Sequence, residues 1–175
     1  MKASAAAWLI PAFGLALVAS AASTKVLVEE ACLKANYKEL CVSTIGSDPE
    51  APSSDLPGLA MIALRLGAAD ASSTSAFILQ SLNDTTLDPT VQQCLADCSD
   101  YYLDAVQQLD NCVAALTVKA LGDAREWIET AIEDVSVCEQ GFKQHASVNP
   151  TMLSARNEMF RKLADNALTV VNALH

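Results

Sequence analysis

Residues 91–116 read VQQCLADCSDYYLDAVQQLDNCVAAL, and this stretch decides the fold. Its apolar side chains return every three or four residues, which places them on one side of an α-helix. The preceding Asp88-Pro89 pair marks a helix start, since aspartate caps the helix and proline suits its first turn. A long, narrow apolar stripe of this kind is typical of a helix in a bundle. Its members are Val91, Leu95, Cys98, Tyr102, Ala105, Leu109, Cys112 and Leu116.

The same stripe recurs on both sides of this stretch. The next helix carries Ala124, Ile128, Ala131, Val135, Cys138 and Phe142. A second cap-and-proline pair, Asn149-Pro150, starts a helix with Leu153, Asn157, Phe160, Ala164, Ala167, Val171 and Leu174. Upstream we expect a helix over Asp55 to Leu82, with Ser72–Ser75 marking a point where it can bend. Short connections make neighbouring helices antiparallel, so the pattern predicts an all-α, up-down-up-down four-helix bundle.

A helical extension precedes the predicted bundle. Two short segments, from about Thr24 to Asn36 and from about Tyr37 to Thr44, are followed by a loop rich in Gly, Pro and Ser over Gly46 to Ser54. We expect the two segments to form an N-terminal helical hairpin.

The first 22 residues have the features of a signal peptide. Lys2 supplies the positive start, Ala5 to Val18 is almost wholly apolar, and the small residues Ala19-Ser20-Ala21-Ala22 fit a cleavage site. The apolar run is shorter than the roughly 20 residues that a membrane span needs. We therefore expect cleavage after Ala21 or Ala22 and one secreted, extracellular domain over residues 23–175.

The chain is acidic, with a formal net charge of −10. Loss of Lys2 with the signal peptide would make this −11, because residues 1–22 contain no Asp or Glu. Such a balance disfavours nucleic acid and anionic membranes as partners. It is explained either by a basic protein partner or by solubility alone. A sequon, Asn83-Asp84-Thr85, lies in a polar stretch between two predicted helices, so we expect Asn83 to be glycosylated.

Secretion makes disulfides the default state of the six cysteines. Cys98 and Cys138 lie at similar heights in the predicted antiparallel hairpin around Ala120, within about 6 Å at 1.5 Å per residue. Cys112 and Cys94 miss the height of Cys138 by about 15 and 12 Å, whereas a bridge needs Cα atoms within about 7 Å. Geometry therefore predicts Cys98–Cys138.

The bonding states of the other four cysteines are inferred from their positions in the chain. Cys32 and Cys41 flank a polar junction, and a hairpin closing there would bring them together. Cys94 and Cys112 are about 27 Å apart on a straight helix and cannot bond to each other. Cys112, on the apolar stripe, is most simply a buried free thiol, while Cys94 is compatible with a buried, exposed or intermolecular position.

The chain lacks the residue sets that enzymes and cofactor sites need. Its two histidines, His145 and His175, have no nucleophile or second base placed with them, and no Gly-rich phosphate loop occurs. Cys94 and Cys98 have no further ligands for a metal. The acidic cluster Glu126, Glu129, Glu133 and Asp134 is most simply a solvated helix face. We expect no catalysis, no cofactor and no metal, and a monomer that binds other proteins.

Three segments resemble the plant invertase and pectin methylesterase inhibitors over essentially the whole mature chain. The pair Cys32 and Cys41 has the family's spacing of about nine. Cys94 to Tyr102 matches the family's Ala-Leu-x-Asp-Cys-x-x-x-Tyr segment, and Trp127 to Ile132, before Cys138, matches its Trp-Leu-Ser-Ala-Ala-Leu segment. The order and spacing of these segments carry the resemblance.

The resemblance implies a four-helix bundle with an N-terminal hairpin and the pairing Cys32–Cys41 and Cys98–Cys138. It also implies one-to-one binding to a cell-wall enzyme, often a basic one, whose substrate cleft the inhibitor blocks. We expect the second and third bundle helices to provide the interface. Side chains off the apolar stripe are the candidates: Asp97, Asp100, Asp104, Gln107 and Gln108.

The chain also departs from the family pattern. Cys94 replaces the family's alanine, Cys112 is additional, and the Pro-Lys-Phe of typical invertase inhibitors is missing near Leu121-Gly122-Asp123. The tryptophan segment and this missing motif favour an inhibitor of pectin methylesterase. The alternatives are an inhibitor of acid (cell-wall or vacuolar) invertase, a non-inhibitory bundle related to pollen allergens, and, more weakly, a small-ligand carrier.

Overall fold

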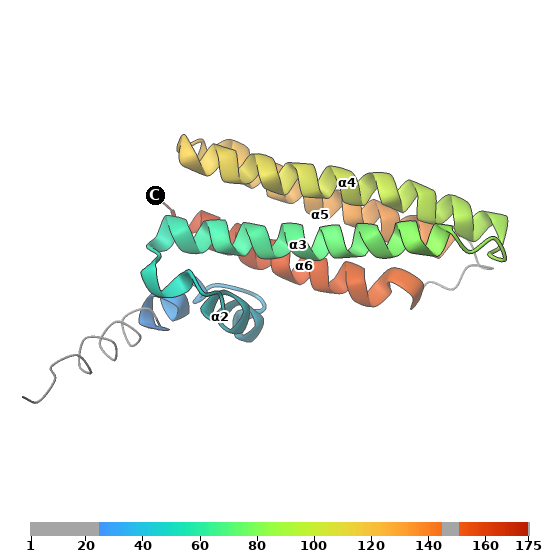
Figure 1. Ribbon diagram of the computed structural model, residues 1–175. Helices are drawn as coiled ribbons and strands as arrows, with labels where there is room; N and C mark the ends of the chain where they lie inside the picture. Colours follow the sequence, from blue (N-terminus) through green and yellow to red (C-terminus); the bar gives the residue numbers. More distant parts are fainter. Residues whose placement is uncertain (1–24, 145–150, 175) are drawn as a thin grey trace, which may run out of the picture.

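Four long helices form the body of the protein in a computed structural model, which describes residues 25–144 and 151–174. They are α3 (Leu56–Leu82), α4 (Pro89–Thr117), α5 (Leu121–Gln144) and α6 (Thr151–Asn172), and they lie side by side (Figure 1). α4 packs between α3 and α5, and α6 packs between α5 and α3, which closes the ring. The predicted all-α four-helix bundle is thus confirmed. No helix in this part of the chain is both long and apolar enough to span a lipid bilayer.

The helix starts follow from capping. The Asp55 carboxylate accepts a hydrogen bond from Gly58 N at 2.9 Å and the Asp88 carboxylate accepts one from Thr90 N at 2.8 Å, each with a proline in the first turn. These bonds satisfy backbone donors that have no partner inside the helix. The Asn149-Pro150 pair and the signal segment 1–22 lie outside the described residues.

The serine-rich middle of α3 does not end the helix. α3 runs as one α-helix from Leu56 to Leu82, with Thr74 and Ser75 buried. Ser72 and Ser73 are exposed, so the polar run divides between the two sides of the helix instead of interrupting it.

The N-terminal hairpin sits at one end of the bundle (Figure 1). Residues 25–31 are helical and α2 spans Lys38–Gly46; a short 3₁₀ turn, η1 (Ala51–Ser53), then leads into α3. The hairpin docks on α6 through polar contacts. Asn36 Nδ2 donates to Asp165 Oδ2 at 3.1 Å, Asn166 Nδ2 donates to the Tyr37 carbonyl at 3.3 Å, and Lys162 Nζ lies 5.5 Å from the Tyr37 ring centre.

Two disulfides join elements that are adjacent in the fold. Cys32–Cys41 closes the hairpin with a Cα separation of 5.8 Å, and Cys98–Cys138 joins α4 to α5 with a Cα separation of 4.8 Å. These are the two pairs expected from the sequence. The α4–α5 turn is centred on Lys119, the single non-glycine with positive φ (61°) among the described residues, rather than on Ala120. This shift brings Cys98 and Cys138 still closer in height.

A buried hydrogen bond crosses the core. Tyr102 of α4 and Asn157 of α6 are 0% and 1% exposed, and the Tyr102 hydroxyl donates to Asn157 Oδ1 at 2.8 Å. The Tyr102 ring also meets Phe160 edge-on, with ring centres 5.9 Å apart. Burial raises the pKa of Tyr102, so the phenol stays protonated and remains a donor.

The change Tyr102→Phe should lower the free energy of unfolding by about 1–3 kcal/mol, because Asn157 would lose its partner without access to water. Urea unfolding measures this loss. Tyr101→Phe is the matched control, since Tyr101 is half-exposed, and it should leave the midpoint almost unchanged. Equal effects of the two changes on the urea midpoint would show that the hydrogen bond between Tyr102 and Asn157 contributes nothing to stability.

Candidate functional site: the α4–α5 face

The charge of the bundle is concentrated on two adjacent helices. α4 has four aspartates and no Lys, Arg or His, and α5 has six acidic residues against Arg125 and Lys143. Together they carry a formal charge of −8. α3 and α6 hold three acidic and four basic residues, a formal charge of +1. One half of the bundle therefore accounts for most of the chain's net charge of −10.

The five interface residues expected from the sequence all lie on α4. Their spacing of three or four residues places them along one side of the helix. Asp97, Asp100, Asp104 and Gln107 are exposed, and Gln108 is half-buried. Gln93 Nε2 donates to Asp97 Oδ1 at 2.7 Å, which orients that carboxylate within the row.

The sequence predicted that the third bundle helix, α5, contributes to the interface, but it did not single out the α5 residues. Asp134 of α5 is close enough to Asp104 of α4 and to Glu133 for the three charges to interact. We call this combined surface the α4–α5 face. It consists of Asp97, Asp100, Asp104, Gln107, Gln108, Glu133 and Asp134. The cluster containing Glu133 and Asp134 was interpreted as a solvated surface, because helical spacing alone does not show which neighbour a side chain approaches.

Asp134 is held in an unfavourable position for a carboxylate. One of its oxygens, Oδ2, is buried and has no hydrogen-bond partner within the described chain. Burial, followed by the negative charges of Asp104 and Glu133, raises the pKa of Asp134 above its ordinary value. The ionised α4–α5 face is therefore under repulsion that a cationic partner would relieve.

This raised pKa sets the sign of a pH effect on stability. The folded state binds the Asp134 proton more tightly than the unfolded state does, so stability falls as the pH rises above the unfolded pKa, near 4, through the folded pKa. Asp134→Asn should therefore raise the urea midpoint at pH 7 and change it less at pH 4. Asp110→Asn, on the exposed part of the same pair of helices, is the control. A lower midpoint for Asp134→Asn at pH 7 would contradict the repulsion.

A small cavity of about 160 Å³ opens at one end of the face beside the Cys98–Cys138 disulfide. Asp97, Tyr101 and Cys94 line it from α4, and Gln140 and Gly141 line it from α5. Cys94 is a buried free thiol whose Sγ lies 3.8 Å from the Gly141 carbonyl oxygen. Of the buried, exposed and intermolecular positions that the sequence left open for Cys94, the structure shows the buried one.

Cys112 is also a buried free thiol, as expected, and its Sγ donates to the Ala124 carbonyl at 3.3 Å. Burial raises the pKa of Cys112 to about 12, so it remains a protonated, unreactive packing residue.

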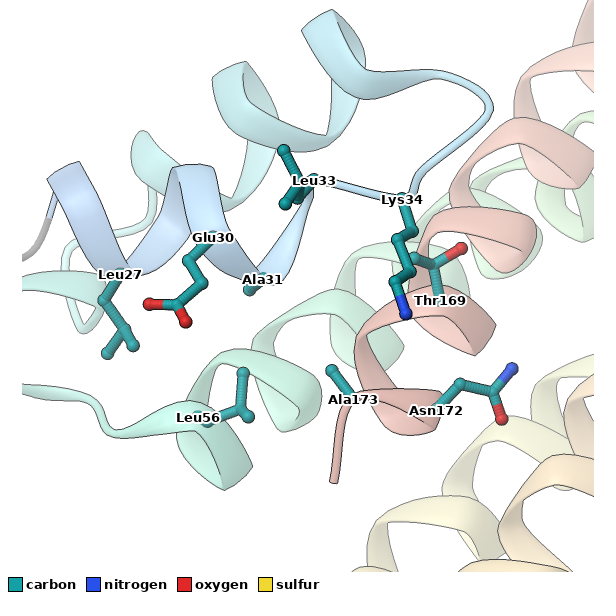
Figure 2. Close-up of a pocket in the computed structure, with 9 residues that line it drawn as sticks. All are labelled: Leu27, Glu30, Ala31, Leu33, Lys34, Leu56, Thr169, Asn172 and Ala173. Atoms are coloured by element: carbon teal, nitrogen blue, oxygen red, sulfur yellow. The ribbon is translucent and has the colours of Figure 1, made fainter. Parts of the chain in front are cut away.

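A larger groove lies elsewhere, between the N-terminal hairpin and the end of the bundle (Figure 2). It has a volume of about 610 Å³. Glu30 and Lys34 are its charged residues, and the walls are otherwise apolar or neutral: Leu27, Ala31, Leu33, Leu56, Thr169, Asn172 and Ala173. The groove has no nucleophile paired with a base. No group of three or more His, Cys, Asp or Glu in the described residues could hold a metal ion.

A helix pair joined by a disulfide and carrying an acidic face is typical of a protein that acts by binding another protein. Comparison with known proteins identifies the family. The sequence profile described as "Plant invertase/pectin methylesterase inhibitor" matches residues 26–170, and this protein belongs to that family. The membership confirms the expectation of an inhibitor protein rather than an enzyme.

Some relatives are named as inhibitors of fructosidase and others as inhibitors of pectinesterase. "Cell wall / vacuolar inhibitor of fructosidase 2" of Arabidopsis thaliana is 31% identical over 73% of this chain and 71% of the relative. "Pectinesterase inhibitor" of Actinidia deliciosa is 29% identical over 85% of this chain and 79% of the relative. A crystal structure of a mutant pectin methylesterase inhibitor from Arabidopsis is similar in fold, with a TM-score of 0.69 and 22% identity over 82% of this chain and 94% of that one.

Proposed function

We propose that this protein inhibits a pectin methylesterase by binding it one-to-one through the α4–α5 face and covering the cleft that takes the pectin chain. The observation that carries the proposal is the charge asymmetry of the bundle, −8 on α4 and α5 against +1 on α3 and α6. A basic enzyme would be attracted to this half of the molecule and oriented by it before contact.

The shape of the α4–α5 face is suited to covering the substrate cleft of an enzyme rather than to catalysing a reaction. α4 and α5 are 29 and 24 residues long, so their shared surface extends over about 35 Å. The Cys98–Cys138 disulfide holds the two helices together, which reduces the ordering that binding would cost. Tyr101 and Trp127 are half-buried on these helices and offer aromatic area of the kind that anchors interfaces.

Inhibition of an acid invertase is the second candidate. It is favoured by the relative at 31% identity, which is named as an inhibitor of fructosidase. Against it stands the start of α5, where Leu121-Gly122-Asp123 replaces the Pro-Lys-Phe of typical invertase inhibitors.

The proposal also includes secretion of the protein to the cell wall after removal of residues 1–22. It further includes that the inhibitor is a monomer.

Titration of the oxidised mature protein into a pectin methylesterase and an acid invertase at mildly acidic pH separates these candidates. We expect stoichiometric loss of the esterase activity only, together with a one-to-one complex by light scattering. Loss of only the invertase activity would replace the first candidate by the second. If neither activity fell across a panel of isoforms and no complex formed, the inhibitor proposal would be rejected in favour of a non-inhibitory bundle.

A further inference from the structure

The turn between α3 and α4 presents the sequon Asn83-Asp84-Thr85 at one end of the bundle. Asn83 is the C-cap of α3, and residues 83–86 are all exposed. In Figure 1 this turn lies at the end opposite the N-terminal hairpin and the C-terminus. A large group attached there meets neither of these elements.

The local structure is compatible with a modified Asn83. Its side-chain nitrogen makes one long hydrogen bond, 3.3 Å to the Leu79 carbonyl oxygen, so attachment displaces little. The turn is held by other bonds, since the Asp84 carboxylate accepts from the Thr86 backbone N at 2.9 Å and from its hydroxyl at 2.6 Å. Leu79, one helical turn before Asn83, is 52% exposed and offers an apolar surface to an attached sugar.

The sequon lies well away from the centre of the α4–α5 face. Asp104 comes fifteen residues after Pro89, where α4 begins, which is about 22 Å along the helix axis. Asn83 directly follows α3, which packs mainly on α4 and α6. A glycan on Asn83 would therefore extend from the end of the bundle and leave the middle of the face open.

We propose that Asn83 carries an N-linked glycan in the mature protein and that the glycan stays outside the contact with the target enzyme. The first half rests on the proposed secretion, because N-glycans are added in the secretory pathway. The second half rests on the proposed use of the α4–α5 face. Together they orient the complex, with the α3–α4 turn pointing away from the enzyme.

The first half is tested by expressing the full chain in a mammalian secretory cell line and measuring the intact mass before and after PNGase F. We expect the treated protein to lose the mass of one N-glycan and to carry aspartate at position 83. Asn83→Gln and Thr85→Ala should abolish the glycan, and Thr85→Ser should retain it. If Asn83 is found unmodified, whether the protein is secreted or retained in the cell, this half of the proposal is overturned.

The second half is tested by moving the glycan. The treated and untreated wild-type proteins should inhibit the same pectin methylesterase within about twofold, because groups outside an interface are nearly neutral. Gln108→Asn with Asp110→Thr creates a sequon on the face, and its glycan should weaken inhibition at least about tenfold by steric exclusion. Treatment of that variant with PNGase F should restore inhibition, which shows that the variant is folded.

The outcomes distinguish this inference from the function on which it rests. Weaker inhibition caused by the natural glycan overturns its placement outside the contact. Full inhibition by the variant glycosylated at position 108 would show that the α4–α5 face is not the binding surface, and the proposed orientation would be rejected with it. The glycan on Asn83 would still be established by the intact-mass measurement. Absence of inhibition by every form rejects the proposed function but leaves the glycan measurement unaffected.

Discussion

Replacement of both Asp100 and Asp104 by lysine is expected to raise the inhibition constant for pectin methylesterase by about tenfold to a hundredfold. Both carboxylates are exposed in the middle of the α4–α5 face, and their reversal changes the local charge by four units. The face would keep three carboxylates and gain two ammonium groups, so most of the attraction to a basic enzyme would be lost, which slows association and weakens the complex. The dependence of inhibition on salt concentration should become shallower at the same time.

The control must change the net charge equally without touching the face. Glu29→Lys with Glu39→Lys does so, since both residues are exposed on the N-terminal hairpin. This variant should inhibit nearly as well as the wild type. Equal inhibition by both double variants would remove the α4–α5 face from consideration, and equal weakening by both would show that only the net charge of the protein matters.

Removal of the α4–α5 disulfide should have the largest effect on stability. Cys98→Ala with Cys138→Ala opens a loop of sequence separation 40, and the entropy of closing such a loop amounts to about 4 kcal/mol. Both cysteines are replaced together so that neither is left to pair with Cys94. Urea unfolding of the oxidised proteins should show the loss as a lower midpoint.

Cys32→Ala with Cys41→Ala provides the comparison. That bridge closes a sequence separation of 9, for which the same treatment gives about 2–3 kcal/mol, and it lies in the hairpin rather than the bundle. A smaller shift than for Cys98–Cys138 is therefore expected. A larger one would mean that the hairpin, and not the α4–α5 pair, governs the stability of the bundle.

The bundle could be predicted because its signals are local. Apolar residues at helical spacing showed which side of each helix is buried, and Asp55 and Asp88 marked helix starts through bonds that form within a few residues. The Cys98–Cys138 pair followed from a constant rise per residue along two antiparallel helices. Each of these inferences needs only the chain near the residue concerned.

The composition of the α4–α5 face could be predicted only in part. The row from Asp97 to Gln108 was found because these residues lie on one helix. The approach of Asp134 to Asp104 depends on how α5 is rotated against α4, which side-chain packing across the bundle decides. The burial of Cys94 depends in the same way on how α5 packs against α4, since its thiol lies 3.8 Å from the carbonyl oxygen of Gly141, a residue 47 positions away.

The placement of the two disulfides also bears on the order in which the molecule comes apart. Neither bridge ties the hairpin to the bundle, and none ties α3 or α6 to their neighbours. Fluctuations can therefore release the hairpin, or loosen α3 and α6, at less cost in free energy than separating α4 from α5. The α4–α5 face, which we propose as the enzyme-binding surface, lies on the two helices that a disulfide joins, so release of the hairpin leaves that surface assembled.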